Sequence, residues 1–168
     1  MLQIDQLDHK ILKLLRRNGR IKNADLARQC GVAPSTMLER MRRLEEEGVI
    51  RGYEAVLDER RMGLTVQGFV MITLDRHNIQ QIRRLEKDIE DVPYVRACYH
   101  LTGRFDYMLH VSARDLDHLG ELIKERIATI PGIGKLETLL VLSEVQTGED
   151  WPSSLKGGQE DGYKKNDP

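Results

Sequence analysis

The fold of this chain is decided at residues 30–44, which read Cys-Gly-Val-Ala-Pro-Ser-Thr-Met-Leu-Glu-Arg-Met-Arg-Arg-Leu and combine a tight turn with the start of a two-sided helix. Gly31 is able to take the positive φ of a turn between helices without a Cβ penalty. Pro34 suits the first helical position, where its missing N–H costs nothing. The predicted helix, residues 34–47, is basic on one side and apolar on the other at the spacing i, i+4, i+7: Met37, Met41 and Leu44.

Two further helices are predicted before this one. Residues 5–17 place their apolar side chains on one helical stripe, with Asp5 as the N-cap. A short helix is predicted to begin at Asn23, whose side chain can cap it, and to run through Gln29. Residues 30–33 then separate this short helix from the next, so the three form a helix-turn-helix unit. On this pattern alone, another kind of small helical bundle remains an alternative.

The charge of the chain is unevenly divided. The 168 residues have a net charge of −1, whereas residues 1–53 contain 11 basic and 7 acidic residues, a balance of +4. A basic head on an acidic body favours a DNA-binding protein. Solvated helix faces are often as highly charged, however, so the asymmetry does not decide the function by itself.

The remaining composition narrows the class of protein. No run approaches the roughly 20 apolar residues of a membrane span, and the first residues lack a basic segment that leads into an apolar one. We therefore expect a cytoplasmic protein with no membrane partner. Cys30 and Cys98 fall in different predicted domains, which argues against a disulfide and for two small buried side chains.

The second half of the chain predicts strands and helices in the order β-α-β-β-α-β, which is that of a ferredoxin-like αβ sandwich. The fold class is therefore α+β, with this sandwich after an N-terminal, winged helix-turn-helix domain. The predicted strands are 68–74, 94–102, 105–112 and 136–145, and the helices are 79–90 and 116–129. The predicted domains are 1–53, a linker strand and hinge at 54–67, the sandwich at 68–148 and a polar, disordered tail at 149–168. The linker strand begins at Val49 and runs to Leu57, and the hinge is a charged turn at 58–63.

This topology leaves one face of the sheet without helices. Residues 69–74 and 139–142 are nevertheless apolar on both sides, so something else has to bury the second face. The simplest solution is a second copy of the sheet, related by a two-fold axis. A homodimer of this kind would hold two helix-turn-helix units in a fixed relation.

Several signatures together resemble the Lrp/AsnC family of feast/famine regulators, and they cover nearly the whole chain to about Val145. They are Leu7-Asp8-His9-Lys10-Ile11-Leu12, Gly19-Arg20-Ile21, Asp25-Leu26-Ala27, Arg40-Met41-Arg42-Arg43-Leu44-Glu45-Glu46-Glu47-Gly48-Val49-Ile50-Arg51-Gly52-Tyr53 and Thr102-Gly103-Arg104-Phe105-Asp106-Tyr107. The resemblance implies a transcription regulator whose C-terminal domain binds a small effector, usually an amino acid. It also implies dimers that assemble further, often into an octamer.

The sequence departs from the family at the start of the recognition helix. The family usually has Ser before Pro34, and here Ala33 stands in that place, so an N-cap worth about 1 kcal/mol is missing or supplied otherwise. His100 and Leu139 lie where the family selects its effector. Leucine therefore cannot be assumed as the ligand.

The N-terminal turn of the recognition helix, opened by Pro34, is expected to enter the major groove of double-stranded DNA. Arg42 and Arg43 are expected to contact phosphates. In the alternative interpretation, Glu39 and Arg43 form only a surface ion pair. The residues expected near base edges are Ser35, Thr36, Glu39 and Arg40.

The resemblance also implies an effector site at the turn from Gly103 to Asp106. Backbone groups and the carboxylate there would meet the charged ends of an amino acid at a subunit interface. Alternatively, Gly103 is only the positive-φ residue of a hairpin and Asp106 only its turn carboxylate. The complete set expected to form the site is His100, Thr102, Gly103, Arg104, Asp106 and Leu139.

Enzyme and metal sites are not expected. Cys98 and His100 share one face of a strand, but a two-residue loop turns His110 to the other face, and a zinc site needs three or four ligands. Cys98 and His100 are also too far apart to form a nucleophile pair, and no phosphate-binding glycine loop is present. We expect no cofactor. Two other functions stay open, an amino-acid-sensing adaptor or assembly protein and an architectural protein that wraps DNA with little sequence preference.

Overall fold

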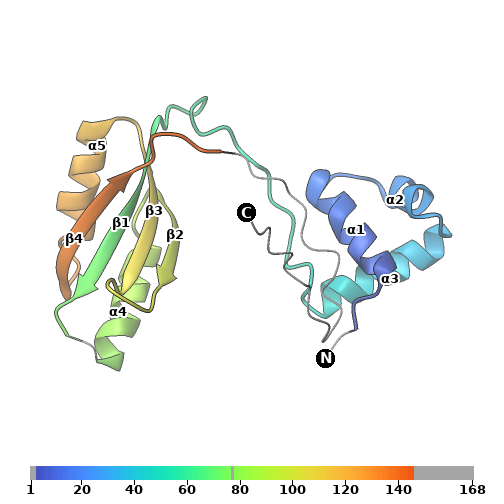
Figure 1. Cartoon of the computed structure of the whole chain (residues 1–168), viewed down its shortest axis with the longest axis horizontal. Helices are drawn as coiled ribbons and strands as arrows, with labels where there is room; N and C mark the ends of the chain where they lie inside the picture. Colours follow the sequence, from blue (N-terminus) through green and yellow to red (C-terminus); the bar gives the residue numbers. More distant parts are fainter. Residues whose placement is uncertain (1–2, 77, 146–168) are drawn as a thin grey trace, which may run out of the picture. The chain divides into compact units, whose positions relative to one another are not determined.

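The computed structural model describes residues 3–76 and 78–145, so the predicted tail at 149–168 lies outside the described residues. Figure 1 shows the elements along the chain. The described residues divide into two compact units between Val56 and Leu57, a position inside the predicted linker. Each unit has its own hydrophobic core.

The first unit contains three helices, α1 (Gln6–Arg17), α2 (Asn23–Cys30) and α3 (Pro34–Glu46). Their apolar sides meet in one core, which confirms the apolar spacing predicted for α1 and α3. The fully or almost fully buried residues of this core are Ile11, Leu26, Ala27, Met37, Met41 and Leu44.

The helix ends follow the sequence in part. Asp5 caps α1 as predicted, and Pro34 occupies the first turn of α3. Gly31 has φ 75°, which is the left-handed conformation that the turn requires. The helix α2 begins at Asn23 as predicted, but the capping role predicted for the Asn23 side chain is wrong, because Lys22 is the residue that precedes α2 and no side chain caps it. Ala33 likewise supplies no side-chain hydrogen bond to the start of α3.

The strand predicted at residues 49–57 is not formed. The described residues 51–57 are exposed and lack regular structure. A strand needs a hydrogen-bonded neighbour, and none of the described strands pairs with this segment. The charged turn at 58–63 belongs to the second unit. Glu59 fixes that turn, since its carboxylate accepts a hydrogen bond of 2.5 Å from the hydroxyl of Ser112 and forms an ion pair with Arg96.

The second unit contains a four-stranded antiparallel sheet in the order β2-β3-β1-β4. With two intervening helices it has the predicted βαββαβ order and is a ferredoxin-like sandwich. The elements are β1 (Val66–Leu74), α4 (Ile79–Glu90), β2 (Val95–His100), β3 (Tyr107–Ala113), α5 (Leu116–Glu121), the π-helical turn η1 (Leu122–Ile127) and β4 (Ile133–Leu140).

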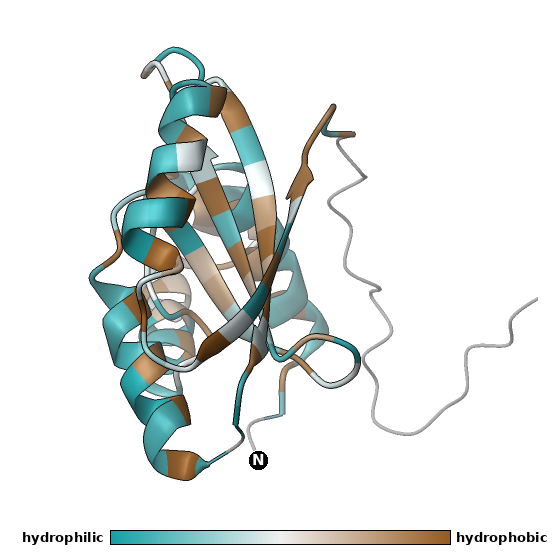
Figure 2. Ribbon diagram, turned by 90° about the vertical axis from the view of Figure 1, so that its left-hand side faces the viewer, coloured by the Kyte–Doolittle hydropathy of each residue, from teal (hydrophilic) through white to brown (hydrophobic). Residues whose placement is uncertain are grey.

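Both helices cover the same face of the sheet (Figure 1). Figure 2 shows apolar residues, in brown, on the strands and on the helices. The apolar side chains of the sheet and of the helices form the core between these two layers. Val70, Ile72 and Leu109 point from the strands into this core and are completely buried. The other side of the sheet, the helix-free face, therefore carries the residues that alternate with them.

Several boundaries differ from the prediction: β1 begins earlier, at Val66, and the two hairpin strands are shorter at the turn, with β2 ending at His100 and β3 beginning at Tyr107. The helix predicted at 116–129 changes to π-helical hydrogen bonding at Leu122. The last strand begins at Ile133 and ends at Leu140, whereas the apolar run had suggested 136–145. Its partner decides these limits, because β1 pairs with β4 from Gly68 opposite Leu140 to Leu74 opposite Ile133. No helix in the described part of the chain is long and apolar enough to cross a membrane.

Candidate nucleic-acid interface and effector site

The polar side of α3 faces away from the core of the first unit. Ser35 and Glu39 are exposed, and Thr36 is partly exposed. The Arg42 side chain is 76% exposed and its Nε lies 2.7 Å from an oxygen of Glu46. This side of α3 thus presents hydroxyl, carboxylate and guanidinium groups, which are the kinds of group that read base edges and phosphates.

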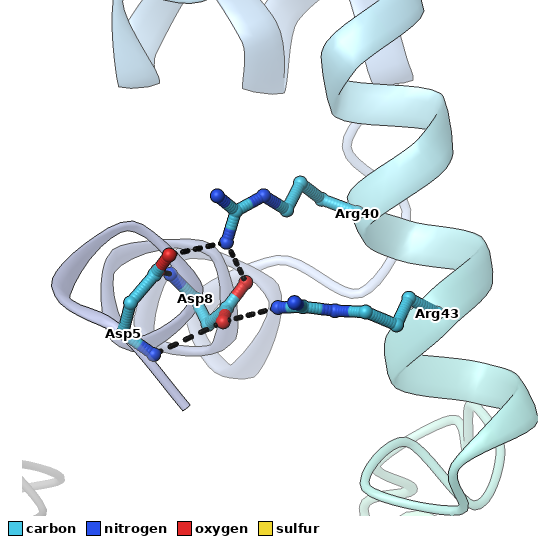
Figure 3. Close-up of polar contacts among 4 residues, drawn as sticks. All are labelled: Asp5, Asp8, Arg40 and Arg43. Carbon is cyan, nitrogen blue, oxygen red and sulfur yellow. Dashed lines mark hydrogen bonds and ion pairs between the residues drawn. The ribbon is translucent and has the colours of Figure 1, made fainter. Parts of the chain in front are cut away.

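Arg40 and Arg43 are engaged within the domain instead (Figure 3). Arg40 binds both carboxylates of the first turn of α1, pairing with Asp5 and lying 3.1 Å from Asp8. Arg43 lies 2.5 Å from the other oxygen of Asp8. The Asp8 side chain is completely buried, so two guanidinium groups offset the cost of removing its charge from water. We call these four residues the Asp–Arg clamp.

The clamp changes the expectation for both arginines. They were expected to face DNA, and the structure places them against α1 with side chains 27% and 38% exposed for Arg40 and Arg43. The alternative ion pair between Glu39 and Arg43 is not formed among the described residues either, because Arg43 turns to Asp8. The sequence indicated only that Asp5 caps the first helix, since nothing local links Asp5 or Asp8 to a helix more than 30 residues away.

Asp5 divides its carboxylate between two tasks. One oxygen, Oδ1, accepts the backbone N–H of Asp8 at 2.9 Å, and the other, Oδ2, accepts from Arg40. Asp8 returns a bond to the backbone N–H of Asp5 at 3.1 Å and completes a capping box. The N–H of Asp8 and then the guanidinium of Arg40 lower the pKa of Asp5 below its usual value, so this carboxylate is charged at neutral pH.

The predicted effector turn joins β2 to β3. Gly103 has φ 130°, and His100 lies opposite Tyr107 in the register expected from a two-residue loop. The Asp106 carboxylate accepts the Leu74 N–H at 2.8 Å. Asp106 therefore ties the turn to the end of β1.

Exposed groups surround this turn. Thr102, Gly103 and Arg104 are all exposed. Arg104 lies 2.9 Å from a carboxylate oxygen of Glu137 on β4, and its guanidinium carbon is 4.8 Å from the centre of the Phe105 ring. The turn thus brings one cation next to exposed backbone groups, as recognition of an anionic carboxylate requires.

His100 and Leu139 lie on opposite faces of the sheet. The ring of His100 stacks on that of buried Tyr107 with centroids 4.6 Å apart, which places it on the side of the helices. Burial and then Glu86, which accepts the Tyr107 hydroxyl at 2.9 Å, raise the pKa of Tyr107. Leu139 pairs with Phe69 and lies on the helix-free face. One chain by itself therefore does not unite these two expected effector residues.

A shallow pocket of about 480 Å³ lies between β2 and α4 and includes His100, Cys98 and Glu86 in its lining. Cys98 is exposed, so its predicted burial is wrong. Desolvation of the thiol in this pocket and then Glu86 raise its pKa to about 11, which leaves the thiol protonated at neutral pH. His110 lies on the helix-free face, opposite to Cys98 and His100, and its ring stacks on that of Phe69. Within the described residues, no three His, Cys, Asp or Glu side chains are placed to hold a metal.

Comparison with known proteins agrees with this architecture. Residues 67–150 match the family model described as the Lrp/AsnC ligand binding domain, and residues 4–51 match the one described as winged helix-turn-helix DNA-binding. The chain belongs to the Lrp/AsnC family. This membership makes it a DNA-binding transcriptional regulator rather than an enzyme.

Two bacterial transcription regulators illustrate the sequence similarity. The Bkd operon transcriptional regulator of Pseudomonas aeruginosa is 37% identical over 145 residues, which cover 86% of this chain and 95% of the relative. The leucine-responsive regulatory protein of Escherichia coli is 32% identical over 143 residues, or 85% of this chain and 87% of the relative.

Solved structures of transcription regulators are also similar. A Neisseria meningitidis transcriptional regulator in complex with L-Met has a TM-score of 0.84 at 27% identity. The match covers 90% of this chain and 98% of the Neisseria chain. AsnC of Escherichia coli has a TM-score of 0.79 at 30% identity, and the match covers 88% of this chain and 97% of the AsnC chain.

Proposed function

We propose that this Lrp/AsnC protein works as a dimeric, cytoplasmic transcription regulator that reads DNA with the exposed side of α3 and responds to an amino acid. The observation that carries the proposal is the presentation of α3, whose buried apolar residues pack in the core while Ser35, Glu39 and Arg42 on its polar side are exposed. A helix held in this way can enter the major groove without disturbing its own core.

Ser35, Thr36 and Glu39 are the residues that we assign to base edges, because they lie in the first half of the exposed side of α3. Pro34 opens the helix and stands next to the DNA backbone in this arrangement. Arg42 is assigned to a phosphate, since its side chain is long, exposed and held only by a surface ion pair.

We expect Glu39→Gln and Arg42→Ala to change DNA binding in different ways. Glu39→Gln should alter the preferred base at one position, with a discrimination change of about 1–3 kcal/mol, because an amide donates where a carboxylate only accepts. Arg42→Ala should weaken binding to every duplex and reduce the salt slope of the affinity by about one. The measurements are binding-site selection and fluorescence anisotropy at several salt concentrations.

Arg84→Ala provides the control for these variants, because Arg84 is also exposed and paired but lies on α4 of the other unit. It should leave both the preferred sequence and the affinity unchanged. Equal binding of selected and random duplexes by the unmodified protein would favour the architectural function instead.

The dimer is proposed to form through the helix-free face of the sheet. Phe69 and Met71 project from the centre of this face, and Leu139 beside them is 49% exposed. Apolar side chains in this number on one open face are typical of an interface. By strand register the same face also contains Tyr99, Met108 and His110. A two-fold dimer would place two α3 helices on half-sites about one helical turn, or a multiple of it, apart.

The amino-acid site is proposed at the turn from Gly103 to Asp106. Arg104 and the exposed backbone would hold the carboxylate of the ligand, whereas Asp106 holds the turn in shape through Leu74. Because His100 and Leu139 lie on opposite faces, a pocket that uses both needs residues from more than one subunit. Assembly of dimers, up to an octamer, would supply such a pocket. The relative solved with L-Met supports the class of ligand.

Calorimetric titration of the full-length protein with each of the twenty amino acids tests this assignment, together with sedimentation velocity in the presence of the best ligand. We expect at least one amino acid to release or absorb heat and to shift the assembly. If none binds, the amino-acid effector is excluded while the DNA-binding function stands.

A further inference from the structure

The Asp–Arg clamp contains one buried carboxylate and one exposed carboxylate. Asp8 is completely buried, whereas the side chain of Asp5 is 48% exposed. Arg40 uses a single terminal nitrogen, Nη1, to contact both carboxylates. The contact of Arg40 with Asp8 is therefore part of the protein interior, and its contact with Asp5 lies at the surface.

Arg40 also occupies the border of the proposed DNA interface. It follows Thr36 by four residues and so lies next to it along the same flank of α3. Its side chain remains 27% exposed, and Figure 3 shows it extending from α3 to the first turn of α1. A guanidinium in this place meets a carboxylate in the free protein and can meet a phosphate when DNA arrives.

We propose that Asp5 is an intramolecular competitor of DNA, a carboxylate that occupies Arg40 in the free protein and must be exchanged for a backbone phosphate on binding. This inference rests on DNA binding through α3. Asp8 stays with Arg43 throughout and keeps α3 seated on α1, so the exchange changes one surface ion pair and leaves the fold intact. Asp5 thereby lowers the affinity for any DNA backbone. As a result, contacts with bases contribute a larger fraction of the free energy of binding.

The two oxygens of Asp5 allow a variant that changes the competition and spares the helix cap. In Asp5→Asn the amide oxygen can replace Oδ1 and accept the Asp8 N–H, and asparagine is as good an N-cap as aspartate. The amide nitrogen replaces Oδ2 and cannot accept from Arg40. Asp5→Asn therefore removes the competitor with little effect on α1.

We expect Asp5→Asn to bind a random-sequence 30-base-pair duplex about two- to fivefold more tightly than the unmodified protein, which is the range that an exposed ion pair supplies. The slope of log affinity against log salt should stay nearly the same, because Arg40 makes the same phosphate contact in both proteins and only the competing ion pair of the free protein is removed. Fluorescence anisotropy with the full chain measures both quantities. Circular dichroism melts show whether the fold is retained.

Glu47→Gln is the matched control, since it also removes one negative charge from the helix-turn-helix unit but lies at the exposed C-terminal end of α3. An equal increase in DNA affinity for Glu47→Gln would show that Asp5 acts only through the net charge of the unit, and this result would overturn the inference. A weaker affinity of Asp5→Asn would overturn it as well.

A double-mutant cycle with Arg40→Gln separates competition for Arg40 from every other effect. The gain from Asp5→Asn should disappear in the Arg40→Gln background, where no guanidinium is released. A gain that persists there would contradict the inference. If the unmodified protein bound neither random nor selected duplexes, the proposed DNA-binding function itself would fail, and this outcome is distinct from a failure of Asp5→Asn alone.

Discussion

Replacing Asp8 by alanine is expected to lower the free energy of unfolding of the helix-turn-helix unit by about 2–3 kcal/mol. Removing one partner of a buried ion pair typically costs about 3–5 kcal/mol, because the remaining charge stays buried without compensation. Here the remaining groups, Arg40 and Arg43, are about a third exposed and regain some hydration, which reduces the cost. The variant also loses the bond from Asp8 to the backbone N–H of Asp5.

Urea unfolding of the full-length protein, followed by hydrogen exchange in peptides from α1 and α3, measures this change. Faster exchange in both helices with unaltered exchange in the sheet of the second unit is the expected pattern. Asp25→Ala is the control, because Asp25 also lies in the first turn of a helix and pairs with an arginine, but with 42% of its side chain exposed. It should cost less than about 1 kcal/mol. Equal effects of the two variants would show that the clamp does not stabilise the unit.

Replacing Leu139 by lysine is expected to separate the proposed dimer and to reduce affinity for a two-half-site operator by about 100-fold or more. The side chain lies on the helix-free face and is 49% exposed, so a lysine is tolerated in the single chain. In the dimer the same lysine would be buried against a second sheet without a partner, at a cost of several kcal/mol. Loss of the second DNA-reading unit removes the gain of bivalent binding, which is about 100- to 10,000-fold.

Sedimentation velocity at micromolar concentration, followed by DNA binding without added amino acid, tests the Leu139→Lys variant. Leu116→Lys is its control, since Leu116 is 61% exposed and lies at the start of α5, away from the helix-free face. The control should sediment and bind as the unmodified protein does. A dimeric Leu139→Lys variant with full affinity would move the interface to another surface.

Local patterns predicted most of the helices and strands. Apolar spacing of 3.6 residues placed α1, α3 and α4 within one residue of their observed limits. The loop at Gly103 also fixed the register of β2 against β3, including His100 opposite Tyr107. These features depend on neighbours in the sequence, so a single chain without its tertiary structure already specifies them.

Features that depend on distant partners were not predicted. The strand at 49–57 has the composition of a strand but no neighbour to pair with, and β4 takes its limits from β1. The expected effector residues include His100 and Leu139, and the alternation of strand side chains in the folded sheet separates them. Which of the expected site residues bind DNA or effector stays a prediction.

The sequence by itself determined the turn at Gly31, the helix that Pro34 opens and the apolar stripe that packs it, because backbone preference and helical periodicity act over a few residues. Only the tertiary structure decided where the basic side of that helix points. Arg40 and Arg43 turn to Asp5 and Asp8 because the packing of α1 on α3 brings a buried carboxylate within reach of two guanidinium groups. A buried charge has to find an opposite charge nearby, and only the folded chain supplies it.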